Sequence, residues 1–341
     1  MEKVFFLNID RSAGHKNLMV KGNKKMTDKA NDPIIVSAVR TPIGVFGGSL
    51  KAASHEHLAV TVLKEVCERV DFSKDLVDDV YWGTVMVRSD ENGLARGAVL
   101  KAGYPDNVSA VQLNRACCSS MEAIRIASME IRLGESQAVV AGGGESMSNV
   151  SYSIKNARWG LGWRHQELSD GIWDGLFDHH TGLIMGMTAE NVAEKYGITR
   201  EMQDEFAYTS QMRAKKALET GRFKDEIVPV VIPGKRGRPD KIIDTDEHPK
   251  PQTTLEELSN LKPAFKKDGT VTAGNASGLN DGASAVLVMS KAMADQHQMK
   301  RQWRIVGSAA IGVDPKIMGI GPVPASKQAL EKAGLKVEDM D

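Results

Sequence analysis

Residues 109–144 read SAVQLNRACCSSMEAIRIASMEIRLGESQAVVAGGG, and this stretch decides the fold. Residues 109–113 predict a short strand, and apolar residues then recur at helical spacing over residues 121–133, before a helix-ending Gly134. Residues 138–141 predict a buried strand. Strand, tight turn, helix and strand make a βαβ unit, and repeated units of this kind predict a mostly parallel α/β sheet.

The same patterns extend in both directions from this unit. The glycine triplet at residues 142–144, taken alone, is more typical of a tight turn after a strand. Residues 149–270 change character and predict a segment inserted over the core. Further strands are predicted at residues 34–38, 80–87, 283–289 and 303–312, and further helices at residues 57–70, 95–102, 188–196, 200–220 and 326–333.

Composition favours an enzyme that acts on small molecules. The chain has 341 residues, of which 41% are hydrophobic, so it can bury a large core and exceeds the usual size of one domain. Its 44 basic residues balance its 44 acidic residues, so no global field attracts nucleic acid or an anionic membrane. No run approaches the 18 apolar residues of a membrane span, and no signal peptide is evident.

Cysteine content and the N-terminus bear on the compartment. The odd set Cys67, Cys117 and Cys118 suits a reducing compartment, so we expect a cytoplasmic protein. Residues 1–31 are rich in lysine and show no sustained hydrophobic periodicity, which predicts a poorly ordered leader. Met26 is an alternative start of the protein. The leader contains one arginine, Arg11, and little serine, which disfavours a mitochondrial targeting peptide.

The cysteines divide into a core candidate and a site candidate. Cys67 falls within a predicted amphipathic helix, where a lone cysteine is usually a small core residue. Cys117 and Cys118 lie where a strand ends and a helix begins, and a helix N-terminus favours the thiolate form of cysteine. Two interpretations remain open from the local residues: a nucleophile, or a buried cysteine pair packed under a helix. A metal site is disfavoured because no second cysteine cluster is present.

The order of residues around Cys117 resembles the acyl-enzyme signature of the thiolase family. The matching positions are Leu113-Asn114-x-x-Cys117-x-Ser119-Ser120-Met121-x-Ala123-Ile124, with Cys117 at the position of the nucleophile. Cys118 departs from the pattern, because the family has a smaller or different residue there. Segments similar to thiolases follow in thiolase order at residues 35–44, 141–148, 185–191, 221–227, 263–265, 270–283, 312–315 and 318–322.

The resemblance implies a thiolase-like α/β fold, in which a duplicated βαβ core forms layers in the order α-β-α-β-α. Residues 32–148 and 277–300 would form the N-terminal core domain, and residues 149–276 a loop domain that binds coenzyme A. Residues 301–341 would start a C-terminal core domain whose remainder we expect beyond Asp341.

The resemblance also implies a CoA thioester as substrate, with no separate cofactor and no metal. Ala273, Gly274 and Ser277 would contact the pantetheine arm, and Lys250 would lie near the nucleotide end of CoA. Four apolar residues would line the pantetheine and acyl tunnel, namely Ile172, Met185, Phe265 and Met318. Many short-chain thiolases have histidine where this chain has Ile184, which bears on the length of the acyl chain.

The implied activity is that of an acetyl-CoA C-acetyltransferase, which joins two acetyl-CoA molecules into acetoacetyl-CoA and CoA through an acyl-Cys117 intermediate. We expect a homodimer or homotetramer. The family's Gly-His-Pro, Cys-x-Gly-Gly-Gly and Asn-Glu-Ala-Phe motifs do not occur in these 341 residues, so we expect the chain alone to be inactive. The alternative is a non-catalytic CoA-binding or interaction protein derived from a thiolase.

Overall fold

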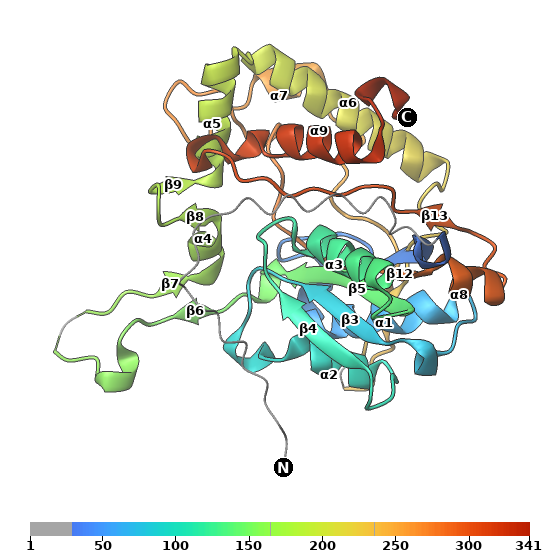
Figure 1. The fold of residues 1–341 in the computed structure, drawn as a ribbon. Coiled ribbons are helices and arrows are strands. Elements are labelled where there is room, and N and C mark those ends of the chain that lie inside the picture. The colour runs from blue at the N-terminus through green and yellow to red at the C-terminus, as the bar shows by residue number, and fades with distance from the viewer. Residues whose placement is uncertain (1–28, 164, 235) are drawn as a thin grey trace, which may run out of the picture.

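A mixed β-sheet forms the centre of the molecule in the computed structural model, which describes residues 29–163, 165–234 and 236–341 (Figure 1). Its strands follow the order β13-β1-β12-β5-β3-β4, and β2 pairs with β12. The strands are β1 (Pro33–Arg40), β2 (Gly44–Val45), β3 (Asp79–Gly83), β4 (Ser109–Leu113), β5 (Ala138–Ser146), β12 (Asn280–Ser290) and β13 (Trp303–Arg304). The predicted leader, including Met26, lies outside the described residues except for Lys29–Asn31, which form a turn of 3-10 helix.

The prediction of a mostly parallel sheet is wrong. Strand β3 pairs in parallel with β4 and β5, as the βαβ unit predicts. Strand β12 is antiparallel to both β1 and β5, and β13 is antiparallel to β1. The parallel rule applies to strands joined by a crossover helix, whereas β12 enters the sheet from the long segment that follows β5.

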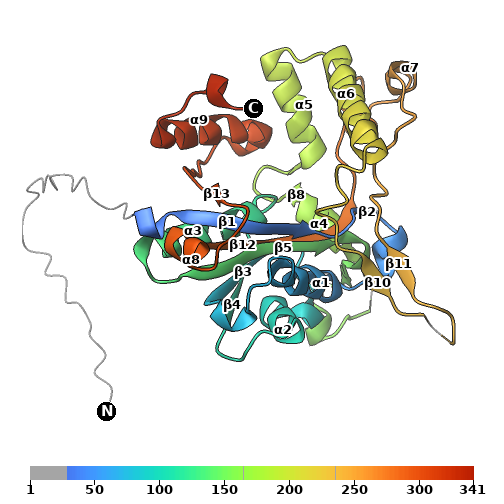
Figure 2. The same cartoon turned by 90° about the vertical axis from the view of Figure 1, so that its right-hand side faces the viewer.

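Helices cover both faces of the sheet (Figures 1 and 2). The helices that pack on the sheet are α1 (His55–Glu68), α2 (Leu94–Lys101), α3 (Ser119–Leu133) and α8 (Lys291–Gln296). The structure also contains α4 (Gly171–Leu176), α5 (Met185–Tyr196), α6 (Arg200–Glu219), α7 (Leu255–Ser259) and α9 (Pro322–Ala333). Side chains alternate along β3: Val80 and Trp82 join the core beneath α1 and α2, while Tyr81 joins the core beneath α3. The strands β3 and β5 are therefore buried on both faces, and the start of α3 lies against Gly83 at the end of β3 and against Gly143 of β5.

Local signals explain where these helices begin and end. The hydroxyl of Ser54 accepts a hydrogen bond from the His57 N–H at 3.1 Å and caps the start of α1. Gly134 ends α3 with a φ of +78°, a left-handed conformation that glycine adopts without steric cost. Among the described residues, no helix is long and apolar enough to cross a membrane.

The glycine triplet at residues 142–144 lies inside β5 and not in a turn, so that prediction is also wrong. Gly142 and Gly143 pair with β3 on one side, and all three glycines pair with β12 on the other. The predicted strand at residues 80–87 ends at Gly83, and the one at residues 303–312 is reduced to Trp303–Arg304. Strand β13 ends early because β1 begins at Pro33, whose carbonyl accepts from the Ile305 N–H at 2.9 Å, so β1 offers no further partner to the residues that follow.

Between β5 and β12 runs a long segment whose helices α5, α6 and α7 stand above the sheet, whereas its β10–β11 strands lie beside α1 (Figure 2), with Val230 and Ile243 in the core beneath α1 and α2. It contains three small hairpins: β6 (Tyr152–Ser153) with β7 (Ser169–Asp170), β8 (Phe177–Asp178) with β9 (Leu183–Ile184), and β10 (Val230–Ile232) with β11 (Lys241–Ile243). Arg40, at the end of β1, fastens this segment to the core through Glu226 at 2.7 Å and Asp246 at 2.7 Å. The division into domains at residues 149–276 and 301–341 stays a prediction.

Candidate active site

Cys117 lies in a tight turn between β4 and α3. Helix α3 begins at Ser119, Cys118 is its N-cap residue, and no side-chain atom among the described residues caps it. Ala116 has a φ of +48°, a left-handed conformation that is uncommon for a residue other than glycine. The turn therefore presents Cys117 at a helix start whose first N–H groups are not occupied by a capping side chain.

Local hydrogen bonds hold the strained turn. The amide oxygen of Asn114 accepts from the Ala116 N–H at 2.8 Å, and the Ser119 hydroxyl accepts from the Arg115 N–H at 2.8 Å. The same hydroxyl donates to the Ala116 carbonyl at 2.6 Å. Backbone strain persists only where surrounding contacts fix it, and Asn114 and Ser119 provide those contacts here.

Two glycines let the start of α3 approach the sheet closely. A Cβ atom on Gly83 would lie 2.5 Å from backbone atoms of Ser119 and Ser120. A Cβ atom on Gly143 would lie 2.1 Å from the Ser120 hydroxyl oxygen and 2.5 Å from the Gly83 carbonyl. Glycine at these two positions therefore sets how deeply the cysteine-bearing turn sits on β3 and β5.

Exposure separates the three cysteines. Cys117 and Cys118 are exposed, which excludes the interpretation of a cysteine pair buried under the helix. Cys67 is buried in the core and lies 3.4 Å from the Tyr104 hydroxyl, so its interpretation as a core residue is confirmed. Burial raises the pKa of the Cys67 thiol, which makes this thiol a poor nucleophile.

A partly buried carboxylate lies behind the turn. Glu145, next to the last glycine of β5, accepts hydrogen bonds from the Val85 N–H at 2.9 Å, the Met86 N–H at 3.2 Å and the Thr84 hydroxyl at 3.1 Å. Burial raises the pKa of Glu145, against the effect of these three donors. Sequence reasoning missed Glu145, although its place after the glycines could have indicated it.

Three of the predicted tunnel residues gather around α5. Met185 is the first residue of this helix, and the ring of Phe265 packs over its neighbour Gly186, where a Cβ atom would lie within 2.4 Å of three ring atoms. Met318 lies in the 3-10 helix Pro315–Ile320, which packs against α5. Phe265 and Met318 are each 39% exposed, so both side chains leave surface available to a ligand.

Ile172 lies apart from that group, on the short helix α4. Its backbone N–H donates to the Asp170 carboxylate at 2.9 Å, which caps the helix. Met86 reaches this helix, since a Cβ atom on Gly175 would lie 2.9 Å from the Met86 methyl group. Met86 therefore connects α4 to the segment that Glu145 holds.

The predicted pantetheine contacts form one loop over α6 and α7. Ala273 and Ser277 are exposed, and Gly274 is partly buried because a Cβ atom there would lie 2.5 Å from the Leu258 side chain. The backbone N–H of Lys250 donates to Gln211 of α6 at 2.8 Å, and Lys250 is exposed. This loop joins the Phe265 segment through a bridge between Pro263 and Thr272.

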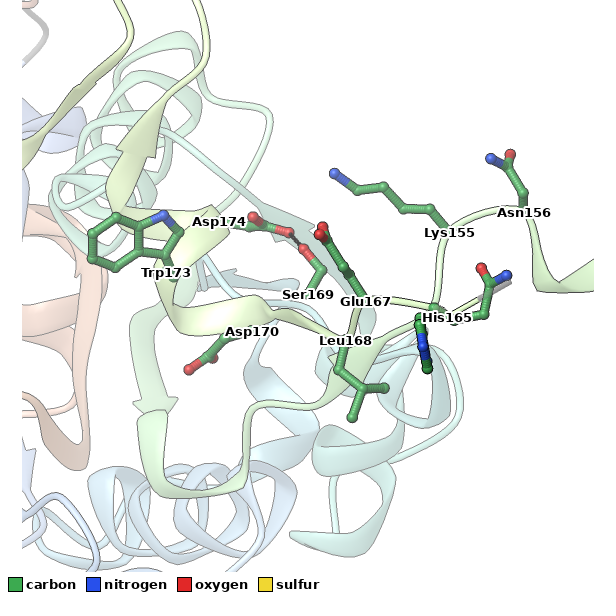
Figure 3. Close-up of a pocket in the computed structure, with 10 residues that line it drawn as sticks. Lys155, Asn156, His165, Glu167, Leu168, Ser169, Asp170, Trp173 and Asp174 are labelled. Atoms are coloured by element: carbon green, nitrogen blue, oxygen red, sulfur yellow. Dashed lines mark hydrogen bonds between the residues drawn. The ribbon is translucent and has the colours of Figure 1, made fainter. Parts of the chain in front are cut away.

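An open pocket of about 570 Å³ lies elsewhere, beside the β6–β7 hairpin (Figure 3). Figure 3 shows polar and charged side chains along most of its wall, and the Ser169 hydroxyl donates to Asp174 at 2.5 Å. The pocket is lined by Lys155, Asn156, His165, Gln166, Glu167, Leu168, Ser169, Asp170, Trp173 and Asp174. Its lining contains none of the residues predicted to bind CoA, and a thioester tunnel needs a more apolar wall.

Among the described residues, neither the buried His55 nor a cluster of metal-binding side chains adds chemistry to this site. His55, the buried first residue of α1, accepts from the Trp82 indole N–H at 3.2 Å and has its pKa lowered to about 4 by burial. His55 contacts Trp82, a residue of the core between the sheet and the helices α1 and α2, on the side of the sheet away from α3, so it is not placed to act as a base for Cys117. Within the described residues, no three histidine, cysteine or acidic side chains lie close enough together to hold a metal ion.

Comparison with known proteins gives one consistent family. Residues 33–292 match the model of the thiolase N-terminal domain, and residues 299–341 match that of the thiolase C-terminal domain. An acetyl-CoA acetyltransferase of Pseudomonas aeruginosa is 47% identical over 315 residues, which are 91% of this chain and 79% of the relative.

Solved structures agree with the sequence matches. The crystal structure of the Bacillus anthracis acetyl-CoA acetyltransferase is similar with a TM-score of 0.88 and 48% identity, over 91% of this chain and 78% of that one. Human mitochondrial 3-ketoacyl-CoA thiolase in complex with CoA is similar with a TM-score of 0.84 and 42% identity, over 92% of this chain and 78% of that one. The chain thus spans roughly four fifths of the length of these proteins.

Proposed function

Because the chain belongs to the thiolase family of acyltransferases, we propose that it acts as an acetyl-CoA C-acetyltransferase with Cys117 as its nucleophile. The observation that carries the proposal is the exposed Cys117 on a strained turn at the uncapped start of α3. A thiolate at a helix start is stabilised by the positive end of the helix dipole and is the reactive form of cysteine.

The first half of the reaction transfers the acetyl group of a bound thioester to Cys117, and it requires that the thiol lose its proton. The Cys117 sulfur attacks the carbonyl carbon of acetyl-CoA, a new carbon–sulfur bond forms, and the bond to the CoA sulfur breaks. The proton that the Cys117 thiol loses on ionising passes through solvent to the CoA thiolate, which leaves as the thiol. The positive end of the α3 dipole is suited to stabilise the negative charge that develops during the attack, while the N–H groups of Cys118 and Ser119 themselves donate to the Arg115 and Ala116 carbonyls.

The second half needs groups that we do not find in these 341 residues. A second acetyl-CoA must lose a proton from carbon, and its carbanion must attack the acetyl group on Cys117 to give acetoacetyl-CoA. The sequence contains no Gly-His-Pro, Cys-x-Gly-Gly-Gly or Asn-Glu-Ala-Phe motif to supply the bases and the oxyanion water. We therefore propose that the isolated 341-residue chain accepts an acetyl group without completing the condensation.

The proposed CoA site uses the two groups of residues around α5 and α6. Met185, Phe265 and Met318 would contact the acyl end and the pantetheine arm, and Ile172 would extend this wall. The exposed loop with Ala273, Gly274 and Ser277 would lie along the pantetheine arm, and Lys250 would face the phosphates. The three ligands proposed are acetyl-CoA, acetoacetyl-CoA and CoA, and no separate cofactor is proposed.

A homo-oligomer is proposed because one edge of the sheet carries apolar surface. Strand β4 is the last strand in the sheet order, and its Val111 is 45% exposed. Met121 on the adjacent α3 is 72% exposed, and Leu133 of the same helix is 64% exposed. An exposed strand edge with apolar neighbours is suited to pair with a second copy about a twofold axis.

A cytoplasmic location is proposed because the cysteines form no disulfide among the described residues. Cys67, Cys117 and Cys118 are all unpaired, which fits a reducing compartment.

The test of the proposed function is transfer from acetyl-CoA, followed in the parent chain and in Cys117→Ala and Cys118→Ala variants. We expect CoA release in one stoichiometric burst from the parent and from Cys118→Ala, and no burst from Cys117→Ala. A burst that survives in Cys117→Ala would show that the nucleophile is misassigned. Binding of CoA without any burst in the parent would instead support a non-catalytic CoA-binding protein.

A further inference from the structure

Glu145 collects three hydrogen bonds from one short segment, residues 84–86. One carboxylate oxygen accepts from the Thr84 hydroxyl and the Met86 N–H, and the other accepts from the Val85 N–H. The segment follows β3 directly, and Thr84 is 2% exposed. Glu145 therefore fixes the backbone of this segment against the end of β5.

The segment in turn holds the turn that carries Cys117. The side-chain amide of Asn114 donates to the Val85 carbonyl at 3.1 Å, and its oxygen accepts from the Ala116 N–H at 2.8 Å. Ala116 has the left-handed conformation and directly precedes Cys117. A continuous set of hydrogen bonds thus runs from Glu145 through residue 85 and Asn114 to the strained peptide beside the thiol.

We propose that Glu145 is a positioning residue for the nucleophile, acting through Val85 and Asn114 to hold the turn in the conformation that presents Cys117 to a thioester. This inference rests on the proposed role of Cys117. Glu145 itself touches neither the thiol nor the substrate in this scheme, and it transfers no proton.

The chemistry of the contact explains why a carboxylate is needed. Both oxygens of Glu145 face donors, so an amide in its place would retain one acceptor and turn its NH2 group toward a backbone N–H. That N–H group, in a partly buried segment, would then lose its acceptor and face a second donor, and the segment would have to move. Glu145→Gln keeps the size of the side chain and replaces only one of the two acceptor oxygens.

The experiment measures alkylation of Cys117 and Cys118 separately, with iodoacetamide on the intact chain and peptide mass spectrometry. The variants are Glu145→Gln, Asn114→Ala and the double variant. The matched control is Glu247→Gln, since Glu247 accepts from the Val45 and Ser49 N–H groups of another loop at 3.1 Å each.

We expect Cys117 to be the faster thiol in the parent, and to slow about tenfold in Glu145→Gln and in Asn114→Ala, while Cys118 changes by less than about twofold. The double variant should be no slower than the slower single variant, because both changes break the same connection. Glu247→Gln should leave the rate at Cys117 unchanged even if it lowers the melting temperature.

Each other outcome has a definite meaning. If Cys118 is the faster thiol in the parent, the proposed function fails. If Cys117 is faster but keeps its rate in Glu145→Gln, or slows equally in Glu247→Gln, the positioning role is overturned and the proposed function stands. If Glu145→Gln does not fold, Asn114→Ala decides alone, because Asn114 is exposed and its removal buries no unpaired group.

Discussion

Replacing Gly83 with alanine should displace the start of α3 and slow Cys117. The added Cβ would lie 2.5 Å from the Ser119 carbonyl carbon and from the Ser120 nitrogen, where ordinary contact begins at 3.4 Å. The backbone must therefore give way by about 0.9 Å, and neither contacting atom belongs to a flexible side chain. Such overpacking costs about 1–3 kcal/mol of unfolding free energy, or about 2–6 °C in melting temperature.

The assay combines thermal unfolding with alkylation of Cys117. Loss of the helix-end geometry should slow alkylation about two- to tenfold, since an anion at a helix start is stabilised by about 0.5–1.5 kcal/mol. Gly312→Ala is the control, because a Cβ atom there meets no heavy atom within 4 Å. An unchanged melting temperature and an unchanged alkylation rate in Gly83→Ala would refute the close approach of α3 to β3.

Three further predictions concern other parts of the molecule. Partial burial opposes ionisation of Asp246, but hydrogen bonds from Arg40 and the Ile43 N–H lower its pKa below the ordinary 3.8. The ionised Asp246 should therefore stabilise the folded protein at neutral pH, and this stabilisation should be lost as the pH falls below that value. Urea unfolding measured from pH 6 to pH 2 should show that the free energy of unfolding falls less in Asp246→Asn than in the parent. Val111→Lys should place a charge on the β4 edge and shift sedimentation toward the monomer, and an unchanged sedimentation coefficient would exclude that edge as the interface. Phe265→Ala should weaken CoA binding about tenfold or more by calorimetry, and equal affinity would remove Phe265 from the site.

The local elements were largely predictable from the sequence. Residues 109–113 form the predicted strand, and α3 starts two residues before the predicted helix at residues 121–133. These elements carry strong periodic apolar patterns and clear end signals such as Gly134. The thiolase family, first indicated by the residues around Cys117, is confirmed by the matches over residues 33–292 and 299–341.

Pairing between distant segments was not predictable in the same way. The antiparallel position of β12 between β1 and β5 depends on the path of the long segment between residues 146 and 280, which periodicity does not record. The glycines at residues 142–144 favour the prediction of a turn because glycine is conformationally free. In the structure, they instead allow Ser120 and strand β12 to approach β5 closely. The role of Glu145 likewise depends on donors about 60 residues away.

The most direct test of the account is to locate the acetyl group after the chain reacts with acetyl-CoA. Residues 117 and 118 fall in one peptide, so fragment-ion mass spectrometry must assign the added acetyl group to one of the two thiols. We predict a single acetyl group on Cys117, formed at the rate of CoA release. Acetylation of Cys118 instead, or CoA release without any acetylated cysteine, would contradict the account.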